Sequence, residues 1–270
     1  MSRKMSRTEK AYILHGSWKM LLGILIAFPI VYALWLSFNQ NGNIAAMRYF
    51  TFQFTLDNFA RFFRDPDFIR VLLTSLRIAF LTTVFCLLIG YPAALFIANL
   101  SDRMQTLMTL LLTLPMWINM LLKTYAWRGI LLNFDFSSEL RVFIGMVYDF
   151  LPFMIIQIHT AIAKLDPNLL VAAHDLGANR VKSFLKVTLP LSVPGIISGI
   201  TLVFLPAVSS FVIPKMLGGG SYVLIGNLIE IYFQQTGDWN FGSAISLIMA
   251  LIIIAAMWAT KKLDRSAQED

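Results

Sequence analysis

Charged residues are scarce in this 270-residue chain, because Asp, Glu, Lys and Arg together make up only 14% of it. Hydrophobic residues make up 57%, which exceeds the needs of a soluble core and is typical of a membrane protein. The net charge of +7 does not indicate nucleic-acid binding, because the basic residues flank the apolar runs, where they anchor helices at lipid headgroups. The composition therefore favours an integral membrane protein in a lipid bilayer.

Cysteine and histidine are almost absent, with one Cys and three His residues. Cys86 lies inside an apolar run, so the sequence predicts neither a disulfide framework nor a thiol cluster for a metal. His15, His159 and His174 lack the His-Glu-x-x-His spacing of a metalloprotease, and no Gly-x-Ser-x-Gly elbow is present. We therefore expect no catalytic residues and no metal or cofactor bound by this chain.

The phosphate-binding loop Gly-x-x-x-x-Gly-Lys-Ser/Thr is also missing, since the glycines at 218–220 are not followed by lysine. The chain therefore cannot hydrolyse a nucleotide by itself. A transporter built from it either has a partner that hydrolyses ATP or works without an ATPase, as a channel or an ion-driven carrier.

Six apolar runs are long enough to cross a bilayer: about 20–38, 71–98, 104–125, 142–163, 192–214 and 242–260. Basic residues in 1–19 and in 261–270 place both termini in the cytoplasm, and 13 of the 22 Lys and Arg residues fall on the cytoplasmic side. The sequence thus predicts an all-α membrane protein, with one transmembrane domain over 20–260 between two cytoplasmic tails.

Two outer connections carry apolar segments of their own. We expect part of 39–70 to lie in the membrane interface, and 224–233, which is too short to span, to form a re-entrant or interfacial helix. The fifth run is expected to be kinked or broken near Pro206 and Pro214.

The most polar helix-forming stretch is residues 166–190, between the fourth and fifth runs on the cytoplasmic side. Asp166-Pro167 pairs an N-cap with a residue suited to the first helical position, and Gly177 can end that helix in the left-handed conformation. Asn179 can cap a second helical piece, which we expect Pro190 to stop. This 166–190 segment therefore predicts two short helices joined at a glycine and exposed to a partner.

The 166–190 segment resembles the EAA loop of permease subunits of ATP-binding-cassette importers. Their pattern is Glu-Ala-Ala, three residues, Gly, nine residues, an aliphatic residue, one residue and Leu-Pro, matched here by Val171-Ala172-Ala173, Gly177, Val187 and Leu189-Pro190. Val171 stands where the family has Glu, and Asp175 is a candidate to replace that acid. The resemblance implies the type I importer permease fold, with a cytoplasmic coupling helix.

The resemblance also implies that this segment docks into a groove on an ATPase subunit. The residues expected at that contact are Val171, Ala172, Ala173, Asp175, Leu176, Gly177, Ala178, Arg180 and Lys182. Small residues allow close approach, Leu176 can fill an apolar pocket, and the basic residues can pair with acids. The alternative is a solvated loop that binds anionic lipid. Docking predicts that Gly177→Asp abolishes coupling without preventing membrane insertion, and that Val171→Glu is tolerated.

Stretches over most of the chain resemble the B-type permeases of spermidine/putrescine importers, among them Leu114-Pro-Met-Trp117, Ala173-His-Asp-Leu-Gly-Ala178 and Asp238-Trp-Asn-Phe-Gly-Ser-Ala244. This resemblance implies a permease of the bacterial plasma membrane that pairs with a second, similar permease. It further implies two cytoplasmic ATPase subunits that use ATP and Mg, and an extracytoplasmic polyamine-binding protein. Import of another small solute by the same machine is the alternative.

A polycationic solute should meet acids and aromatic faces along its path. Asp149 lies about 12 Å along the fourth run, and an acid at such a depth usually faces a cavity or a partner. The candidates for the path are Trp117, Tyr148, Asp149, Glu230 and Trp239. For Asp149 the alternative is a structural pair with Lys123, Arg128 or the partner permease, and for the two tryptophans it is plain packing.

Overall fold

The computed structural model describes residue 23, residues 25–39 and residues 54–269 of the chain. Within these ranges the chain is helical, and its β pairing is limited to an isolated bridge between Asn39 and Phe54. The chain divides into two compact units. The smaller unit comprises Met1–Arg64 and Tyr232–Ile248, and the larger unit comprises Asp65–Ile231 and Met249–Asp270.

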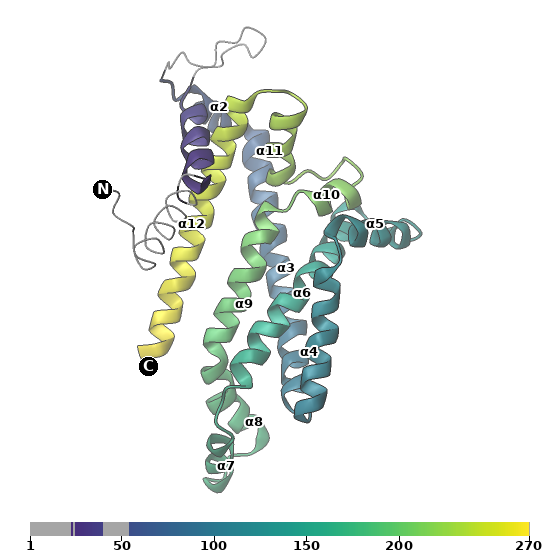
Figure 1. Ribbon diagram of the computed structural model, residues 1–270, viewed down its shortest axis with the longest axis vertical. Coiled ribbons are helices and arrows are strands. Elements are labelled where there is room, and N and C mark those ends of the chain that lie inside the picture. The colour runs from purple at the N-terminus through teal and green to yellow at the C-terminus, as the bar shows by residue number, and fades with distance from the viewer. Residues whose placement is uncertain (1–22, 24, 40–53, 270) are drawn as a thin grey trace, which may run out of the picture. The chain divides into compact units, whose positions relative to one another are not determined.

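Three long helices form the core of the larger unit: α3 (Pro66–Ala98), α6 (Ser138–Ile162) and α9 (Leu189–Ser209) (Figure 1). Each of the three packs against the other two. Their buried faces are lined by Ile78, Ala79, Ala94, Met146, Met154, Ile158 and Val203. The apolar composition that predicted membrane helices therefore also supplies the packing between them.

Small residues and buried polar contacts bring these helices together. A Cβ atom added at Gly199 of α9 would collide with Met154 of α6, and one added at Gly195 would press on the α6 backbone. The Tyr91 hydroxyl of α3 and the Ser192 hydroxyl of α9 share a buried hydrogen bond of 2.8 Å. Close packing at small residues and interhelical hydrogen bonds commonly stabilise helix association in lipid, because the hydrophobic effect does not favour contact between two apolar helices there.

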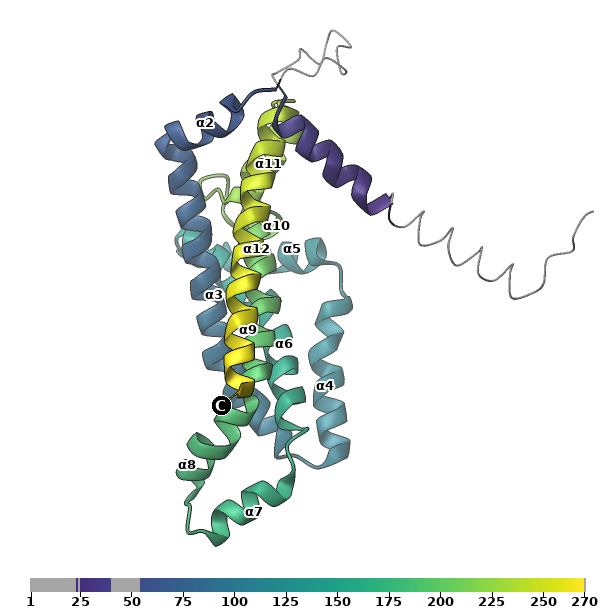
Figure 2. The same ribbon diagram turned by 90° about the vertical axis from the view of Figure 1, so that its left-hand side faces the viewer.

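The third predicted span, 104–125, consists of two helices, and the break falls where Pro115, Trp117 and Asn119 interrupt the apolar run. α4 (Asp102–Trp117) and α5 (Met120–Leu131) meet at an angle of 91°. Figure 2 shows the sharp bend between them. Ile118 is extended, and the Asn119 side chain accepts a hydrogen bond of 2.8 Å from the Leu121 amide. Asn119 thus acts as the N-cap of a new helix.

Two other spans begin earlier than predicted because of N-cap residues. Asp65 accepts a hydrogen bond of 3.0 Å from the Asp67 amide, so α3 starts at Pro66 and not near 71. The Ser137 hydroxyl accepts a hydrogen bond of 3.2 Å from the Leu140 amide, so α6 starts at Ser138, four residues before the predicted start at 142. Both corrections lengthen helices into predicted connections.

The chain after α9 contains two short helices and one long one. α9 ends at Ser209 and α10 (Val212–Leu217) follows, so the expected break falls between Pro206 and Pro214, and both prolines lie inside helices. α11 (Ile225–Gln234) has ten residues, which confirms a short helix at this position. α12 (Trp239–Glu269) continues beyond residue 260, so the predicted C-terminal tail is helical through Glu269.

Four helical stretches are long and apolar enough to cross a membrane: Pro66–Ala98, Ser138–Ile162, Arg180–Ser209 and Trp239–Lys262. The bent pair α4 and α5 adds a fifth if it counts as one span. A shorter apolar helix, Leu25–Ser37, occupies part of the first predicted span, and the rest of that span lies outside the described residues.

Polar contacts hold the smaller unit together. α2 (Asp57–Arg64) carries Asn58, whose buried side-chain amide donates to the carbonyls of Ser37 and Asn39 at 3.1 and 3.0 Å. The Arg61 guanidinium pairs with Asp238 at 2.9 Å and lies 4.1 Å from the centre of the Phe241 ring. The described part of the predicted connection 39–70 thus contains α2, which contacts the start of α12 in the same unit, and the first residues of α3.

Candidate coupling site and solute path

The 166–190 segment begins with the helix that its sequence predicts. α7 (Pro167–Asp175) starts with Pro167, and the Asp166 carboxylate accepts a hydrogen bond of 2.9 Å from the Asn168 amide. This N-cap satisfies one of the amides that a helix start leaves without a partner.

A glycine turn ends α7. Gly177 has a φ of +79°, its amide donates to the His174 carbonyl at 2.8 Å, and the Ala178 amide reaches back to the Ala173 carbonyl at 3.0 Å. These two bonds are the Schellman arrangement, which requires a left-handed residue at the position of Gly177. The predicted glycine junction is confirmed.

The second half of the segment departs from the prediction at Pro190. α8 (Arg180–Ser183) is capped by Asn179, which accepts from the Lys182 amide at 2.9 Å, as expected. A π-helical turn, Phe184–Thr188, then leads directly into α9, so Pro190 does not stop the helix. The wider turn suits a proline, which has no amide to donate and whose ring would clash with the carbonyl four residues earlier in a regular helix.

The 166–190 segment presents apolar side chains outward. Leu176 at the glycine turn is 89% exposed, and Val171 and Val181 are also exposed. Among the other predicted contact residues, Ala172, Asp175, Gly177, Arg180 and Lys182 are exposed and Ala173 and Ala178 are half-buried. The described residues thus leave an apolar surface exposed on this segment.

Asp175 lies one helical turn after Val171 on α7. Residues four apart on a helix share a face, so a carboxylate at 175 projects beside the position where the EAA pattern has Glu. Both residues are exposed, and the ion pairs found within the described ranges do not include Asp175.

Asp149 is buried beside a base. The Lys123 ammonium of α5 donates to the Asp149 carboxylate of α6 at 2.5 Å, and the two side chains are only 11% and 12% exposed. Of the alternatives weighed from the sequence, the structure thus contains the pair with Lys123. Next to it, the rings of Trp127 and Tyr148 lie 4.9 Å apart. The sequence did not single out Trp127, although it follows Lys123 by one helical turn.

Glu230 is likewise paired. Its side chain, on α11, is 8% exposed and accepts from the Lys215 ammonium of α10. Sequence reasoning missed Lys215, because α10 and α11 are separate helices whose contact no spacing rule predicts. Neither predicted path acid is therefore a lone charge.

The two predicted tryptophans belong to other helices, α4 and α12. Trp117 ends α4 at the break and is 78% exposed. Trp239 belongs to the smaller unit, where its ring packs against Phe233 with 6.2 Å between centres. Of the candidates, Tyr148 and Asp149 are neighbours on α6, where they contact Trp127 and Lys123 respectively.

Tyr222, in the loop after α10, lies near the ion pair formed by Arg77 of α3 and Glu139 of α6. Burial raises the pKa of the Tyr222 phenol, and the nearby Glu139 carboxylate raises it further. The phenol is therefore neutral at physiological pH.

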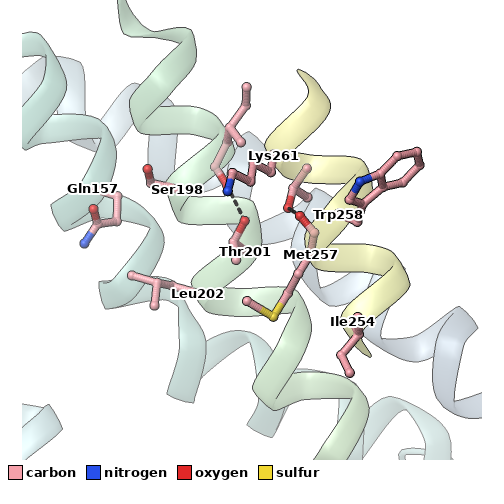
Figure 3. A pocket seen from close by; sticks show the side chains of 10 residues that line it. Gln157, Ser198, Thr201, Leu202, Ile254, Met257, Trp258 and Lys261 are labelled. Carbon is pink, nitrogen blue, oxygen red and sulfur yellow. Dashed lines mark hydrogen bonds between the residues drawn. The ribbon is translucent and has the colours of Figure 1, made fainter. Parts of the chain in front are cut away.

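A cavity of about 700 Å³ opens between α6, α9 and the C-terminal half of α12 (Figure 3). Its lining comprises Gln157, Ile197, Ser198, Thr201, Leu202, Ile254, Met257, Trp258, Thr260 and Lys261. None of these residues is acidic, and Lys261 carries a positive charge. The lining therefore repels a cation and contains none of the predicted path residues.

Within the described ranges, no group of three or more His, Cys, Asp or Glu residues is placed to hold a metal ion. Cys86 is buried in α3 and close to the Val147 carbonyl, where it packs as a small apolar residue.

Comparison with known proteins adds the family. A profile described as "Binding-protein-dependent transport system inner membrane component" matches residues 19–269. The spermidine/putrescine transport system permease protein PotB of Escherichia coli (strain K12) is 37% identical over 238 residues, which is 80% of this chain and 86% of that protein. PotB of Haemophilus influenzae (strain ATCC 51907 / DSM 11121 / KW20 / Rd) is 38% identical over 242 residues, 82% and 84% of the two chains.

A solved structure shows the same fold. The crystal structure of a bacterial ABC transporter involved in the import of the acidic polysaccharide alginate contains a chain that superposes with a TM-score of 0.71. The two chains are 15% identical, and the match covers 95% of this chain and 96% of that one. The chain therefore belongs to the family of binding-protein-dependent transport system inner membrane components and is a multi-pass permease of the plasma membrane.

Proposed function

We propose that this chain is a permease subunit of an ATP-binding-cassette importer of polyamines such as spermidine and putrescine. The observation that carries the substrate is the 37–38% identity to PotB over four fifths of the chain. A fold alone would not define the solute, since the similar alginate transporter, by its description, imports an acidic polysaccharide.

The proposed topology has six crossings with both termini in the cytoplasm. The four long spans, the bent pair and Leu25–Ser37 supply six candidate crossings. The excess of Lys and Arg on the assigned cytoplasmic side supports this orientation. In this topology 1–19 and 261–270 are cytoplasmic, 20–260 is the permease domain, and the 166–190 segment faces the cytoplasm.

We propose that partner subunits supply the energy for transport by hydrolysing ATP. A second permease completes the path, two ATPase subunits bind ATP and Mg, and an extracytoplasmic binding protein delivers the polyamine. Each ATPase receives the 166–190 segment of one permease as a coupling helix, and ATP-driven closure moves both permeases from inward-open to outward-open. The exposed Leu176 and the uncovered face of α7 support this assignment.

The proposed path runs past Trp117, Tyr148, Asp149, Glu230 and Trp239. Because Lys123 and Lys215 already neutralise the two acids, the carboxylates act by exchanging one ammonium partner for another. A resident lysine would pair with each acid in the empty protein, and a substrate ammonium would replace it during passage.

Reconstitution in proteoliposomes tests the function. The chain, with a second permease, the ATPase and a polyamine-loaded binding protein, should take up radiolabelled spermidine only when ATP is supplied. Uptake without ATP would contradict the ATP-driven mechanism and favour a channel or an ion-driven carrier. ATP-driven uptake of a different solute would contradict the polyamine assignment alone.

A further inference from the structure

A second cavity, of about 520 Å³, lies between α4 and α6, and its lining includes none of the proposed path residues. Six of its seven lining residues carry a polar side chain, and the seven are Asp102, Gln105, Thr106, Thr109, Leu110, Thr113 and His159. Lipid offers these groups no hydrogen bond, so the acceptor capacity that the protein leaves open on this side of α4 is available to a polar ligand.

The α4 residues of this lining form one stripe. Asp102, Thr106, Thr109 and Thr113 recur at intervals of three or four residues and therefore share one face of the helix. The stripe is about 16 Å long, with oxygen atoms about one helical turn, 5.4 Å, apart. Ammonium groups separated by three or four methylene groups in a linear polyamine have a similar spacing.

The hydroxyl groups of the stripe present acceptor atoms. Thr106 donates its proton to the Asp102 carbonyl at 2.9 Å, and Thr113 donates to the Leu110 carbonyl at 2.8 Å. With their protons used inside the helix, these oxygens offer lone pairs to the cavity. The Thr109 hydroxyl has no hydrogen bond to another residue in the described ranges.

The Gln105 side chain is held in one orientation. Its amide nitrogen donates to the carbonyls of Ala98 and Leu100 at 3.2 and 2.9 Å. Its oxygen is therefore left to accept from the His159 ring nitrogen, at 3.3 Å. The lining thus combines one carboxylate with several acceptor oxygens and includes no lysine or arginine, in contrast to the cavity that Lys261 lines.

The position of the cavity gives it a role. Asp102 begins α4, and His159 lies three residues before the end of α6, which leads into α7 (Figures 1 and 2). The cavity therefore opens at the end of the larger unit that carries the 166–190 segment. In the proposed topology this is the cytoplasmic end.

We propose that the cavity between α4 and α6 is a polyamine-binding subsite at the cytoplasmic exit of the permease. This inference rests on the proposed polyamine function. Ammonium groups bind successively along the threonine stripe, and Asp102 at its mouth attracts the cation as it leaves. The hydroxyl oxygens solvate the cation without holding it as tightly as a row of carboxylates would, so release stays fast.

The test uses the reconstituted importer and a triple variant, Thr106→Val, Thr109→Val and Thr113→Val, which removes the hydroxyls and keeps the side-chain shape. We expect spermidine uptake to fall about tenfold, the loss typical of hydrogen bonds to a charged group, while assembly with the ATPase persists. The corresponding Thr→Ser triple variant should restore uptake. Thr160→Val serves as the matched control, because Thr160 is exposed on α6, donates to the Ile156 carbonyl and does not line the cavity.

The outcomes separate this inference from the proposed function. Wild-type spermidine uptake combined with unchanged uptake by the valine variant would overturn the subsite and leave the importer assignment intact. No spermidine uptake by the wild-type importer would overturn both. Loss of assembly with the second permease in the valine variant, restored by serine, would show that the partner covers this face and would also overturn the subsite.

A labelling measurement covers the case in which the triple variant fails to fold. Thr109→Cys should react about fivefold faster with a positively charged thiosulfonate than with a negatively charged one, and spermidine should slow the reaction. Cys86 is buried and gives little background. Equal rates without protection by spermidine would contradict a cation site.

Discussion

Lys123 and Asp149 form an ion pair of 2.5 Å between α5 and α6, with both side chains close to nine-tenths buried. Removing one partner leaves an uncompensated charge in an apolar surrounding. We therefore expect Asp149→Asn or Lys123→Gln alone to lower the free energy of unfolding by about 3 kcal/mol, and the double variant to lose much less. Thermal unfolding of the purified permease in detergent measures the three values, and additive losses would contradict direct pairing.

The same pair allows a test of the path. Exchanging the two residues, Lys123→Asp with Asp149→Lys, keeps a pair but moves the carboxylate to α5. We expect the exchanged variant to recover stability and to keep less than about a tenth of wild-type spermidine uptake, because the acid no longer projects from α6. Full uptake by the exchanged variant, or by Asp149→Asn made at normal levels, would leave Asp149 with a structural role only.

N-cap residues and helix-ending glycines in the sequence correctly predicted where short helices begin and end. Asp166, Gly177 and Asn179 act within a few residues of their own positions, so the two helices of the 166–190 segment and their junction could be foreseen. Asn119 stands out in the sequence as an interruption of an apolar run, but its role as the N-cap of a second helix is not predicted, because a single polar residue there also fits a polar spot inside one span.

Other features depend on contacts between distant residues. That Lys123, and not Arg128, meets Asp149 follows from the angle at which α5 leaves α4, which no spacing in the sequence reveals. The passage of the helix through Pro190 depends on a π-helical turn, which has no recognised sequence signature. The threonine stripe of α4 is visible in the sequence, but only the fold places it beside His159.

Two glycines in neighbouring helices give a matched test of packing in the larger unit. A methyl group added at Gly145 of α6 would meet Leu217 and Ile213 of α10, whereas one added at Gly129 of α5 has nothing within 4 Å. We expect Gly145→Ala to lower the free energy of unfolding by about 1–3 kcal/mol through overpacking. Gly129→Ala should leave it unchanged or raise it by less than about 1 kcal/mol. Equal melting temperatures for the two variants would contradict the close contact of α6 with α10.

Two substitutions at Gly177, to Asp and to Asn, test whether the bulk or the charge of a side chain there prevents coupling. Nothing lies within 4 Å of an added Cβ atom there, so a side chain at 177 would meet no neighbour in the permease, and its cost is limited to the strain of the left-handed backbone. Asn tolerates the left-handed conformation better than most residues and matches Asp in size. If close packing against the ATPase excludes any side chain, Gly177→Asp and Gly177→Asn should both reach the membrane and both fail to couple.

The measurement for Gly177 is ATP hydrolysis stimulated by loaded binding protein, with membrane levels as the control. Normal stimulation in Gly177→Asp would contradict the docking account of the 166–190 segment. Loss in Gly177→Asp alone would mean that charge, and not bulk, is excluded from the groove.

Val171 is the position where the segment departs from the EAA pattern, and Asp175 is the candidate to replace the missing acid. Both are exposed on one face of α7, so a carboxylate at either position can reach the same basic group on an ATPase. We expect Asp175→Asn to weaken ATPase binding about tenfold, as the loss of one charge-assisted contact would. Val171→Glu should be tolerated alone and should restore binding when combined with Asp175→Asn.

The affinity of the ATPase for the permease, measured by titration in nanodiscs, tests these expectations. Normal binding by Asp175→Asn would show that docking here needs no acid, and the exposed Leu176 would then carry the contact by apolar burial.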